Sequence, residues 1–144
     1  MADAKKEKEM QEKFIIYQLM QKQLESFRGQ AAELEKGFFE TETTRQAIED
    51  LKKINAENEI MIPLGSGFFV QGKITNRKGV LMSPGSSIML EKDIKGGLEA
   101  VEKRKADIEN ASRDLQKQIN EVVQKINELG PELEQMVAET RKKS

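Results

Sequence analysis

The chain lacks the two side chains on which many enzyme active sites depend. It has no histidine and no cysteine among its 144 residues, which excludes Ser-His-Asp and Cys-His nucleophiles and ordinary zinc sites. Acidic pairs such as Glu33 with Glu35 lie in strongly charged segments, where carboxylates are normally solvated. The sequence therefore predicts no enzyme, no cofactor and no metal site.

A glycine-containing segment in the middle of the chain resembles a phosphate-binding loop only superficially. Phosphate loops place a helix N-terminus directly after the glycines, so that free N–H groups face the anion. Here Gly65-Ser66-Gly67 is followed by Phe68-Phe69-Val70, which has the character of a strand. We therefore expect a tight turn.

Apolar recognition is the chemistry that the sequence does support. Residues 14–20 hold six apolar side chains in seven positions, although a paired helix buries only two or three of every seven. The excess should be partly exposed, and methionine side chains adapt to varied partners. The candidate binding residues are Phe14, Ile15, Ile16, Leu19, Met20, Leu133, Met136 and Val137. Ordinary helix packing is the competing interpretation for Met20 and Met136.

The end of the chain carries the pattern of a coiled-coil helix. Starting at Ile94, alternating steps of four and three residues pass through fourteen positions to Thr140, and eleven of them are apolar. We call this line of positions the seam. A seam this narrow covers too little surface for a globular core, so the helix must pair with another helix. The helix should continue through Pro131, because Leu129, Leu133 and Met136 stay in register.

The start of the chain supplies a matching partner helix. From Met10 to Thr41, eight of ten positions at the same spacing are apolar, after which the pattern is expected to shift phase and continue through Ile48, Leu51 and Ile54. The predicted helices cover residues 8–56 and 93–142. Their equal lengths favour an antiparallel hairpin within one chain over a parallel oligomer of separate helices.

Residues 60–91 have a different pattern, that of two β-hairpins in tandem. Short alternating apolar runs are separated by turn residues, with the fourth strand expected at residues 87–90 and Pro63 at an edge or bulge. Four short strands cannot bury their own apolar faces, so hairpins from several subunits should join into a barrel. The predicted assembly residues are Ile62, Leu64, Phe68, Phe69, Val70, Val80, Met82, Ile88 and Leu90.

The amino-acid composition indicates which classes of binding partner and which cellular compartment to expect. Charged residues make up 34% of the chain and aromatic residues 5%, with a net charge of −1. Interleaved charges of both signs favour neither nucleic acid nor an anionic membrane. There is no apolar run long enough to span a membrane and no signal-peptide pattern after Met1, so we expect a cytoplasmic protein.

The hairpin region and its flanking helices resemble one known family. Residues 61–70 (MIPLGSGFFV), residues 80–92 (VLMSPGSSIMLEK) and the second helix with Leu98-Glu99-Ala100 are similar to the α-type subunit of prefoldin, over nearly the full chain. Departures are Pro84 and Ser86 in the second turn and the pair Gly96-Gly97, which either loosens the helix start or permits close approach of another backbone.

The resemblance implies an α+β fold, organised as a single prefoldin-like domain over residues 1–144. In it a long antiparallel coiled-coil hairpin is joined to two central β-hairpins that form an oligomeric β-barrel platform. It further implies a hetero-hexamer with β-type subunits, two α-type and four β-type. Family members hold unfolded proteins at the coiled-coil tips and deliver them to a group II chaperonin without ATP. The alternative function is a structural or tethering coiled coil that the β segment merely oligomerises.

Overall fold

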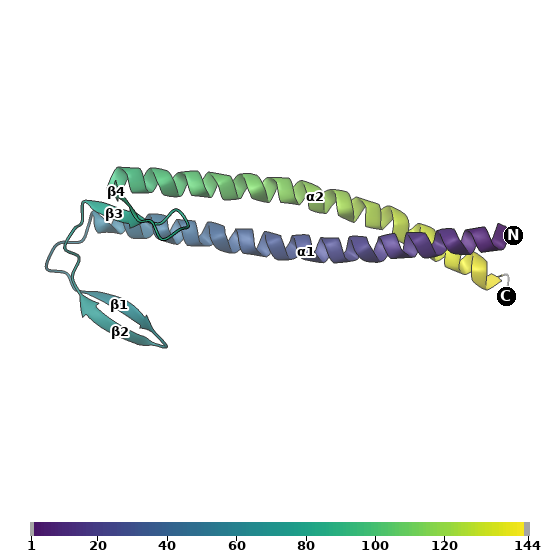
Figure 1. The fold of residues 1–144 in the computed structure, drawn as a ribbon, viewed down its shortest axis with the longest axis horizontal. Helices are drawn as coiled ribbons and strands as arrows, with labels where there is room; N and C mark the ends of the chain where they lie inside the picture. The colour runs from purple at the N-terminus through teal and green to yellow at the C-terminus, as the bar shows by residue number, and fades with distance from the viewer. Residues whose placement is uncertain (1, 143–144) are drawn as a thin grey trace. The chain divides into compact units, whose positions relative to one another are not determined.

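Two long helices flank two β-hairpins in the computed structural model, which describes residues 2–142 (Figure 1). The elements in chain order are α1 (Ala2–Leu51), β1 (Ile60–Gly65), β2 (Phe68–Gly72), β3 (Gly79–Met82), β4 (Leu90–Asp93) and α2 (Ile94–Lys142). The predicted fold class is thereby confirmed in its elements. Residues 1, 143 and 144, which fall within the predicted domain, lie outside the described residues.

The chain divides into two compact units. The terminal unit comprises Met1–Lys36 and Glu109–Ser144, and the hairpin unit comprises Gly37–Ile108. Both helices run through both units, so each unit holds one segment of α1 and one segment of α2.

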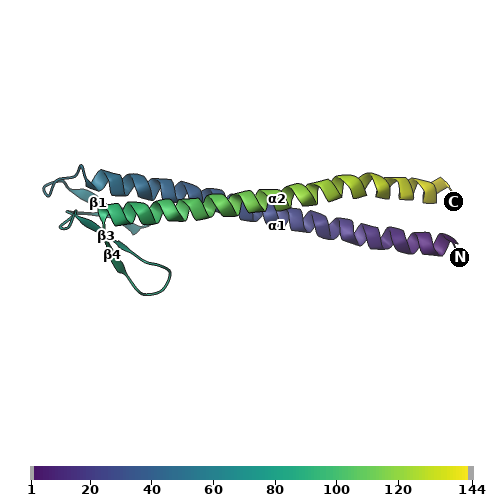
Figure 2. The same ribbon diagram turned by 90° about the horizontal axis from the view of Figure 1, so that it is seen from above.

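The two helix segments of the terminal unit pack in antiparallel orientation. Lys13 forms an ion pair with Glu132, and Tyr17, one turn further along α1, lies beside Gly130, which precedes Glu132 on α2. Figures 1 and 2 both show the start of α1 and the end of α2 at the same end of this helix pair. The buried apolar residues of this unit, Leu115, Ile119, Val122 and Leu133, all occupy predicted seam positions.

The exposure pattern along the helices follows the predicted spacing. On α1, positions 10, 13, 17, 20, 24, 27, 31 and 34 are all less exposed than the residues between them. On α2, the polar seam residues Ser112 and Thr140 are exposed, whereas the apolar ones are buried or half-buried. The α2 helix also continues through Pro131, as predicted.

Antiparallel pairing also holds within the hairpin unit. Glu42 contacts Lys105, and Ile48 lies near Gly97. Thr41 and Ile48 are both buried and Arg45 between them is half-buried, so the four-three spacing continues as far as Ile48. Leu51, three residues further on, is half-buried whereas Lys52 is exposed, so the pattern shifts phase only after Ile48. Arg45 occupies a seam position that an apolar residue normally fills.

The α1 helix ends earlier than the predicted residue 56. The N–H groups of Lys52 and Lys53 donate to the carbonyls of Glu49 and Asp50 at 3.2 and 3.0 Å, the i to i−3 pattern that tightens a last turn. Asn55 then accepts a bond from the N–H of Glu57 through its side chain, at 3.0 Å. Such local bonds compete with helix continuation.

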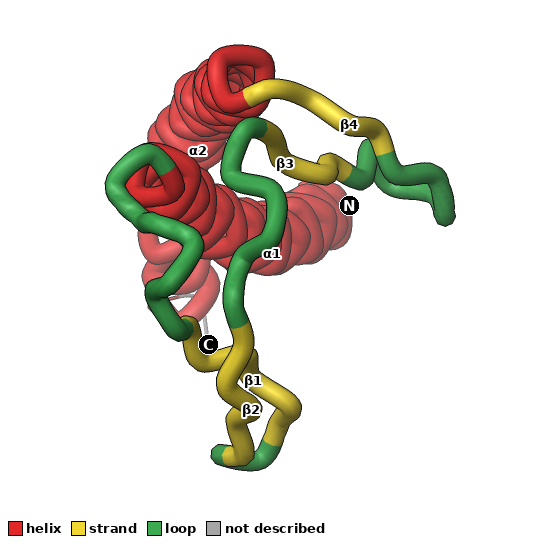
Figure 3. Tube along the Cα trace, turned by 90° about the vertical axis from the view of Figure 1, so that its left-hand side faces the viewer, coloured by secondary structure: helices red, strands yellow, loops and turns green. Residues whose placement is uncertain are grey.

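The hairpins form two separate two-stranded antiparallel sheets (Figure 3). In the first, Ile62 pairs with Val70 and Pro63 pairs with Phe69, with a register irregularity between Pro63 and Gly65. Pro63 therefore lies beside a bulge, as predicted. In the second, Met82 pairs with Leu90. The predicted fourth strand at residues 87–90 is displaced, because the ladder with β3 begins only at Leu90.

A tight turn joins β1 to β2. Gly65, Ser66 and Gly67 all have positive φ, at 111°, 52° and 83°, a conformation that glycine adopts at little cost. A strand follows the turn, so the phosphate-loop interpretation is excluded by the backbone as well as by the sequence.

Gly96 and Gly97 serve two different purposes at the start of α2. The N–H of Gly96 donates to Asp93 Oδ1 at 2.7 Å, which caps the helix. A β-carbon on Gly97 would lie 2.7 Å from Val80 Cγ2 and 3.8 Å from Ile48 Cδ1. Gly97 thus makes room for the side chain of Val80 on β3, so what approaches closely is a side chain and not the backbone that the sequence-based explanation named.

We predict that Gly97→Ala destabilises the protein although alanine is the better helix former. Alanine gains up to about 1 kcal/mol of helix propensity, but the added methyl overlaps a stiff β-branched side chain, and such overpacking costs about 1–3 kcal/mol. The control is Gly29→Ala, where a β-carbon meets no atom within 4 Å. Chemical denaturation should show Gly29→Ala more stable than the unmutated chain and Gly97→Ala less stable; equal stabilisation would contradict the close approach.

Candidate functional site

The predicted binding residues of the terminal unit divide into exposed and packed groups. Ile15, Ile16 and Leu19 are between 45% and 60% exposed, and we call these three residues the outward stripe. Phe14 and Val137 are also exposed. The three remaining candidates, Met20, Leu133 and Met136, are half-buried or buried because they occupy seam positions.

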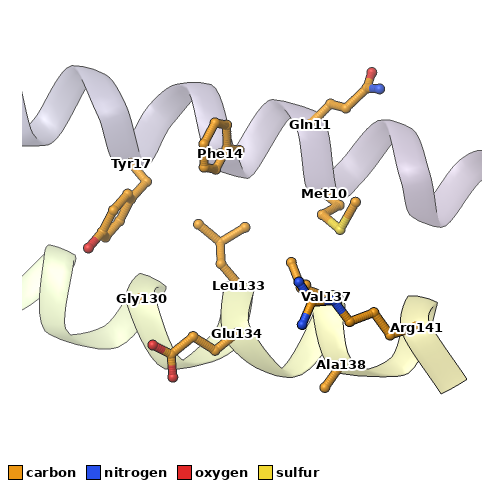
Figure 4. A pocket seen from close by; sticks show the side chains of 10 residues that line it. All are labelled: Met10, Gln11, Phe14, Tyr17, Gly130, Leu133, Glu134, Val137, Ala138 and Arg141. Carbon is orange, nitrogen blue, oxygen red and sulfur yellow. The ribbon is translucent and has the colours of Figure 1, made fainter.

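An apolar groove runs between the two helices of the terminal unit. Its volume is about 720 Å³ (Figure 4). The residues that line it are Met10, Gln11, Phe14, Tyr17, Gly130, Leu133, Glu134, Val137, Ala138 and Arg141. Phe14 and Met10 of α1 face Leu133 and Val137 of α2 across the open space (Figure 4). The groove therefore joins exposed candidates to packed ones in a single concave surface.

Small residues on α2 help to make room for this groove. Gly130 has no side chain, and a β-carbon there would lie 3.6 Å from the Tyr17 ring at Cε2. Ala138 contributes only a methyl group to the lining. The Tyr17 ring of α1 thus lies beside the backbone of α2 rather than beside a bulky side chain.

Several lining residues were missed by the sequence-based list. The list covers Phe14, Leu133 and Val137 but not Tyr17, Gly130, Ala138 or Arg141. Composition alone cannot identify a glycine or an alanine as part of a binding surface. The available signal was that Gly130, next to the seam of α2, faces the seam residue Tyr17, but this pairing is evident only when the register of the two helices is known.

The chemistry of this surface is apolar contact without directed catalysis. Residues 2–142 hold no group of three or more acidic side chains placed to bind a metal ion. Within the same residues neither helix has an apolar stretch long enough to cross a membrane. A half-exposed apolar groove that includes a flexible methionine suits ligands of varied sequence.

The hairpins expose a second apolar surface. Of the nine predicted assembly residues, seven are exposed, namely Ile62, Leu64, Phe68, Phe69, Val70, Ile88 and Leu90. Val80 and Met82 are half-buried, and Val80 packs toward Gly97 within the same chain. Met61, Leu81 and Met89 were not predicted but are also exposed, so apolar side chains lie on both faces of the first hairpin.

Comparison with known proteins identifies relatives over most of the chain. A family model described as Prefoldin subunit matches residues 20–139. The Prefoldin subunit alpha of Pyrococcus horikoshii is 30% identical over 134 residues, covering 88% of this chain and 90% of the relative. The Prefoldin subunit alpha of Archaeoglobus fulgidus is 28% identical over 127 residues, covering 88% and 93%.

A solved structure shares the fold. The filamentous PFD from Methanocaldococcus jannaschii, determined by cryo-EM, superimposes with a TM-score of 0.72, covering 81% of this chain and 96% of that chain. At 22% sequence identity this similarity supports the arrangement of helices and hairpins and no finer property.

We predict that Gly130→Leu fills the groove and reduces the binding of an apolar fluorescent dye such as anilinonaphthalene sulfonate. The new side chain starts beside the Tyr17 ring and occupies the groove. It also adds apolar area, so dye binding would rise if the dye responded only to the overall hydrophobicity of the surface. Gly29→Leu is the matched control, because that position has open surroundings and does not line the groove. Unchanged dye fluorescence in Gly130→Leu, with helicity retained by circular dichroism, would show that the groove does not bind apolar ligands.

Proposed function

The chain belongs to the prefoldin family, and from this premise we propose that it is an α-type subunit of an ATP-independent holdase. A holdase is a chaperone that keeps unfolded proteins from aggregating without hydrolysing a nucleotide. In this proposal the terminal unit captures the unfolded client, and the hairpin unit joins the subunit to its partners.

The exposed apolar surface of the terminal unit is the observation that carries the proposal. The outward stripe presents aliphatic side chains, and the groove adds aromatic and thioether side chains beside the polar Gln11, Glu134 and Arg141. Unfolded proteins expose apolar side chains in no fixed order, so a surface for them needs area and adaptability rather than a hydrogen-bond pattern. We propose Phe14, Ile15, Ile16, Leu19 and Val137 as its main contacts, with Met20, Leu133 and Met136 supporting them from the seam.

Assembly through the hairpins follows from their exposed faces. A two-stranded hairpin is only marginally stable alone, and both hairpins leave free strand edges. We propose that hairpins of several subunits close into a β-barrel platform, in a hetero-hexamer with two α-type and four β-type subunits. The nine predicted assembly residues then become buried between subunits. Val80 is already half-buried against Gly97 of its own chain.

The destination of the client is inferred from the family. We propose that the complex passes its client to a group II chaperonin in the cytoplasm, without nucleic acid, membrane, cofactor or metal. A tethering coiled coil that binds one defined partner is the alternative. Protection of several unrelated denatured proteins from aggregation supports the holdase, whereas indifference to them supports the tether.

We predict that Ile15→Ser with Ile16→Ser and Leu19→Ser weakens client capture and leaves the fold intact. These side chains lie outside the seam, so helix pairing does not depend on them. At roughly 25 cal/mol per Å² of apolar area, their loss should weaken each contact by about 1–2 kcal/mol. Aggregation of a denatured client is measured by light scattering, using complexes in which only this chain varies.

The matched control is Phe39→Ser, which removes a 73% exposed apolar side chain from the hairpin unit instead. It should leave protection unchanged, because it lies outside the outward stripe and the groove. Full protection by the triple variant, at normal helicity and complex size, would assign client capture to other subunits and refute the proposal for this chain.

We also predict that Phe69→Asp with Ile88→Asp prevents assembly. Both side chains are more than half exposed in the single chain, so the helices should fold normally, but burial of two carboxylates in a subunit contact is costly. Sedimentation velocity should show a smaller species at unchanged helicity. Ser66→Asp, which places the same charge in the first turn, should assemble normally; an intact complex of the double variant would exclude these hairpins from the interface.

A further inference from the structure

We propose that charged residues at seam positions form two polar layers that select the pairing of α1 with α2 of the same chain over parallel pairing of identical helices from two chains. The layers consist of Lys105, Arg45 and Glu42 in the hairpin unit, and of Lys13 and Glu132 in the terminal unit. This inference concerns the specificity of helix pairing and is independent of client capture.

The first layer lies in the hairpin unit. Lys105 occupies a seam position of α2, and its Nζ lies 2.7 Å from Glu42 Oε1 on α1 and 5.4 Å from the centre of the Phe38 ring. Arg45 occupies a seam position of α1, and its Nε lies 3.5 Å from Glu42 Oε2. One carboxylate thus serves two seam cations, and the hydrogen bond from Lys105 holds the pKa of Glu42 below its usual value of 4.5.

The second layer has the same design in the terminal unit with the helices exchanged. Lys13 occupies a seam position of α1 and forms an ion pair with Glu132 of α2. Glu132 is adjacent to the buried seam residue Leu133. In both layers, therefore, a lysine in the seam reaches a glutamate on the flank of the facing helix.

These pairs are poor candidates for stabilising the fold. The side chains of Lys105 and Glu42 are 26% and 34% exposed, and those of Lys13 and Glu132 are 35% and 49% exposed. Ion pairs with this degree of exposure contribute little, whereas an apolar residue at a seam position contributes packing. A charged seam residue instead specifies the register and the partner of a coiled coil, at a cost in stability.

The alternative pairings explain why specificity is needed. In an in-register parallel pair of two α1 helices, Lys13 faces Lys13 and Arg45 faces Arg45; in a parallel pair of two α2 helices, Lys105 faces Lys105. No seam position of either helix between residues 10 and 140 carries a glutamate or aspartate, so in these pairs the seam cations face one another without an acidic seam residue between them. The apolar seam residues alone do not distinguish such pairs from the antiparallel one.

The test uses the full-length chain with a single cysteine reporter. Leu24→Cys places a thiol at a seam position of α1, and no natural cysteine competes with it. In the antiparallel fold this thiol faces α2, whereas in a parallel α1 pair it faces its counterpart in the second chain. Mild oxidation followed by non-reducing electrophoresis therefore reports parallel pairing as disulfide-linked dimer.

The informative variant replaces Lys13, Arg45 and Lys105 with leucine in the reporter background. We expect disulfide-linked dimer to increase by about tenfold, the change that corresponds to 1.4 kcal/mol of lost specificity, and the midpoint of thermal unfolding to rise. The two single replacements Lys13→Leu and Lys105→Leu should each give a smaller increase, and they decide the question if the triple variant misfolds. A raised midpoint with no increase in dimer would overturn the proposal.

Two controls separate charge from other causes. Lys13→Glu with Glu132→Lys reverses one ion pair without changing the net charge. The amount of disulfide-linked dimer should stay at the level of the reporter chain, since like charges still face each other in a parallel pair.

The second control repeats the comparison in chains that also carry Phe69→Asp and Ile88→Asp, which removes the proposed hairpin contacts. If the increase in dimer persists in this background, it supports the polar layers whether or not the hairpins mediate assembly. If the increase disappears, the dimer is due to hairpin contacts and not to the loss of the polar layers.

Discussion

The narrow seam is the constraint on which the rest of this structure depends. A coiled-coil pair buries only two positions in seven, and the buried apolar side chains of residues 2–142 are few: Ile48, Leu115, Ile119, Val122 and Leu133. Any further apolar residue on either helix must remain at least partly exposed. The outward stripe and Phe39 are exposed for this reason, and the hairpins cannot be covered by helices whose apolar positions are already paired.

The hairpins depend on the helices for position but not for burial. Val80 packs beside Gly97 and Ile48, and Arg77 Nη1 donates to the carbonyl of Ile54 at 2.5 Å, which ties the segment between the hairpins to the segment after α1. These contacts restrain the β segment, while most of its large apolar side chains stay exposed. A segment built in this way needs other chains to complete its core, which is why it suits an assembly role.

The sequence predicts the helices well because a repeat of seven residues is a long-range signal. It fails where a single side chain departs from the repeat. Arg45 interrupted the apolar pattern between Thr41 and Ile48, although it occupies a seam position and pairs with Glu42 three residues earlier on the same helix. The run from Ile88 to Leu90 indicated a strand, but the ladder pairs Leu90 with Met82 and continues into charged residues up to Asp93. The groove could not be predicted, because Gly130 and Ala138 acquire meaning only opposite Phe14 and Tyr17.

The same helices thus meet two opposed requirements by placing different chemistry in the seam and outside it. Pairing must be specific, and a charge in the seam penalises wrong partners, because only one arrangement brings Lys105 to Glu42. In the proposed function the terminal unit also binds many different clients, and the outward stripe carries no charge that a client would have to match. Charges in the stripe would restrict clients, and a purely apolar seam would permit helices to exchange partners. The location of a side chain relative to the seam therefore determines whether it contributes to selecting the partner helix or to the proposed binding of varied clients.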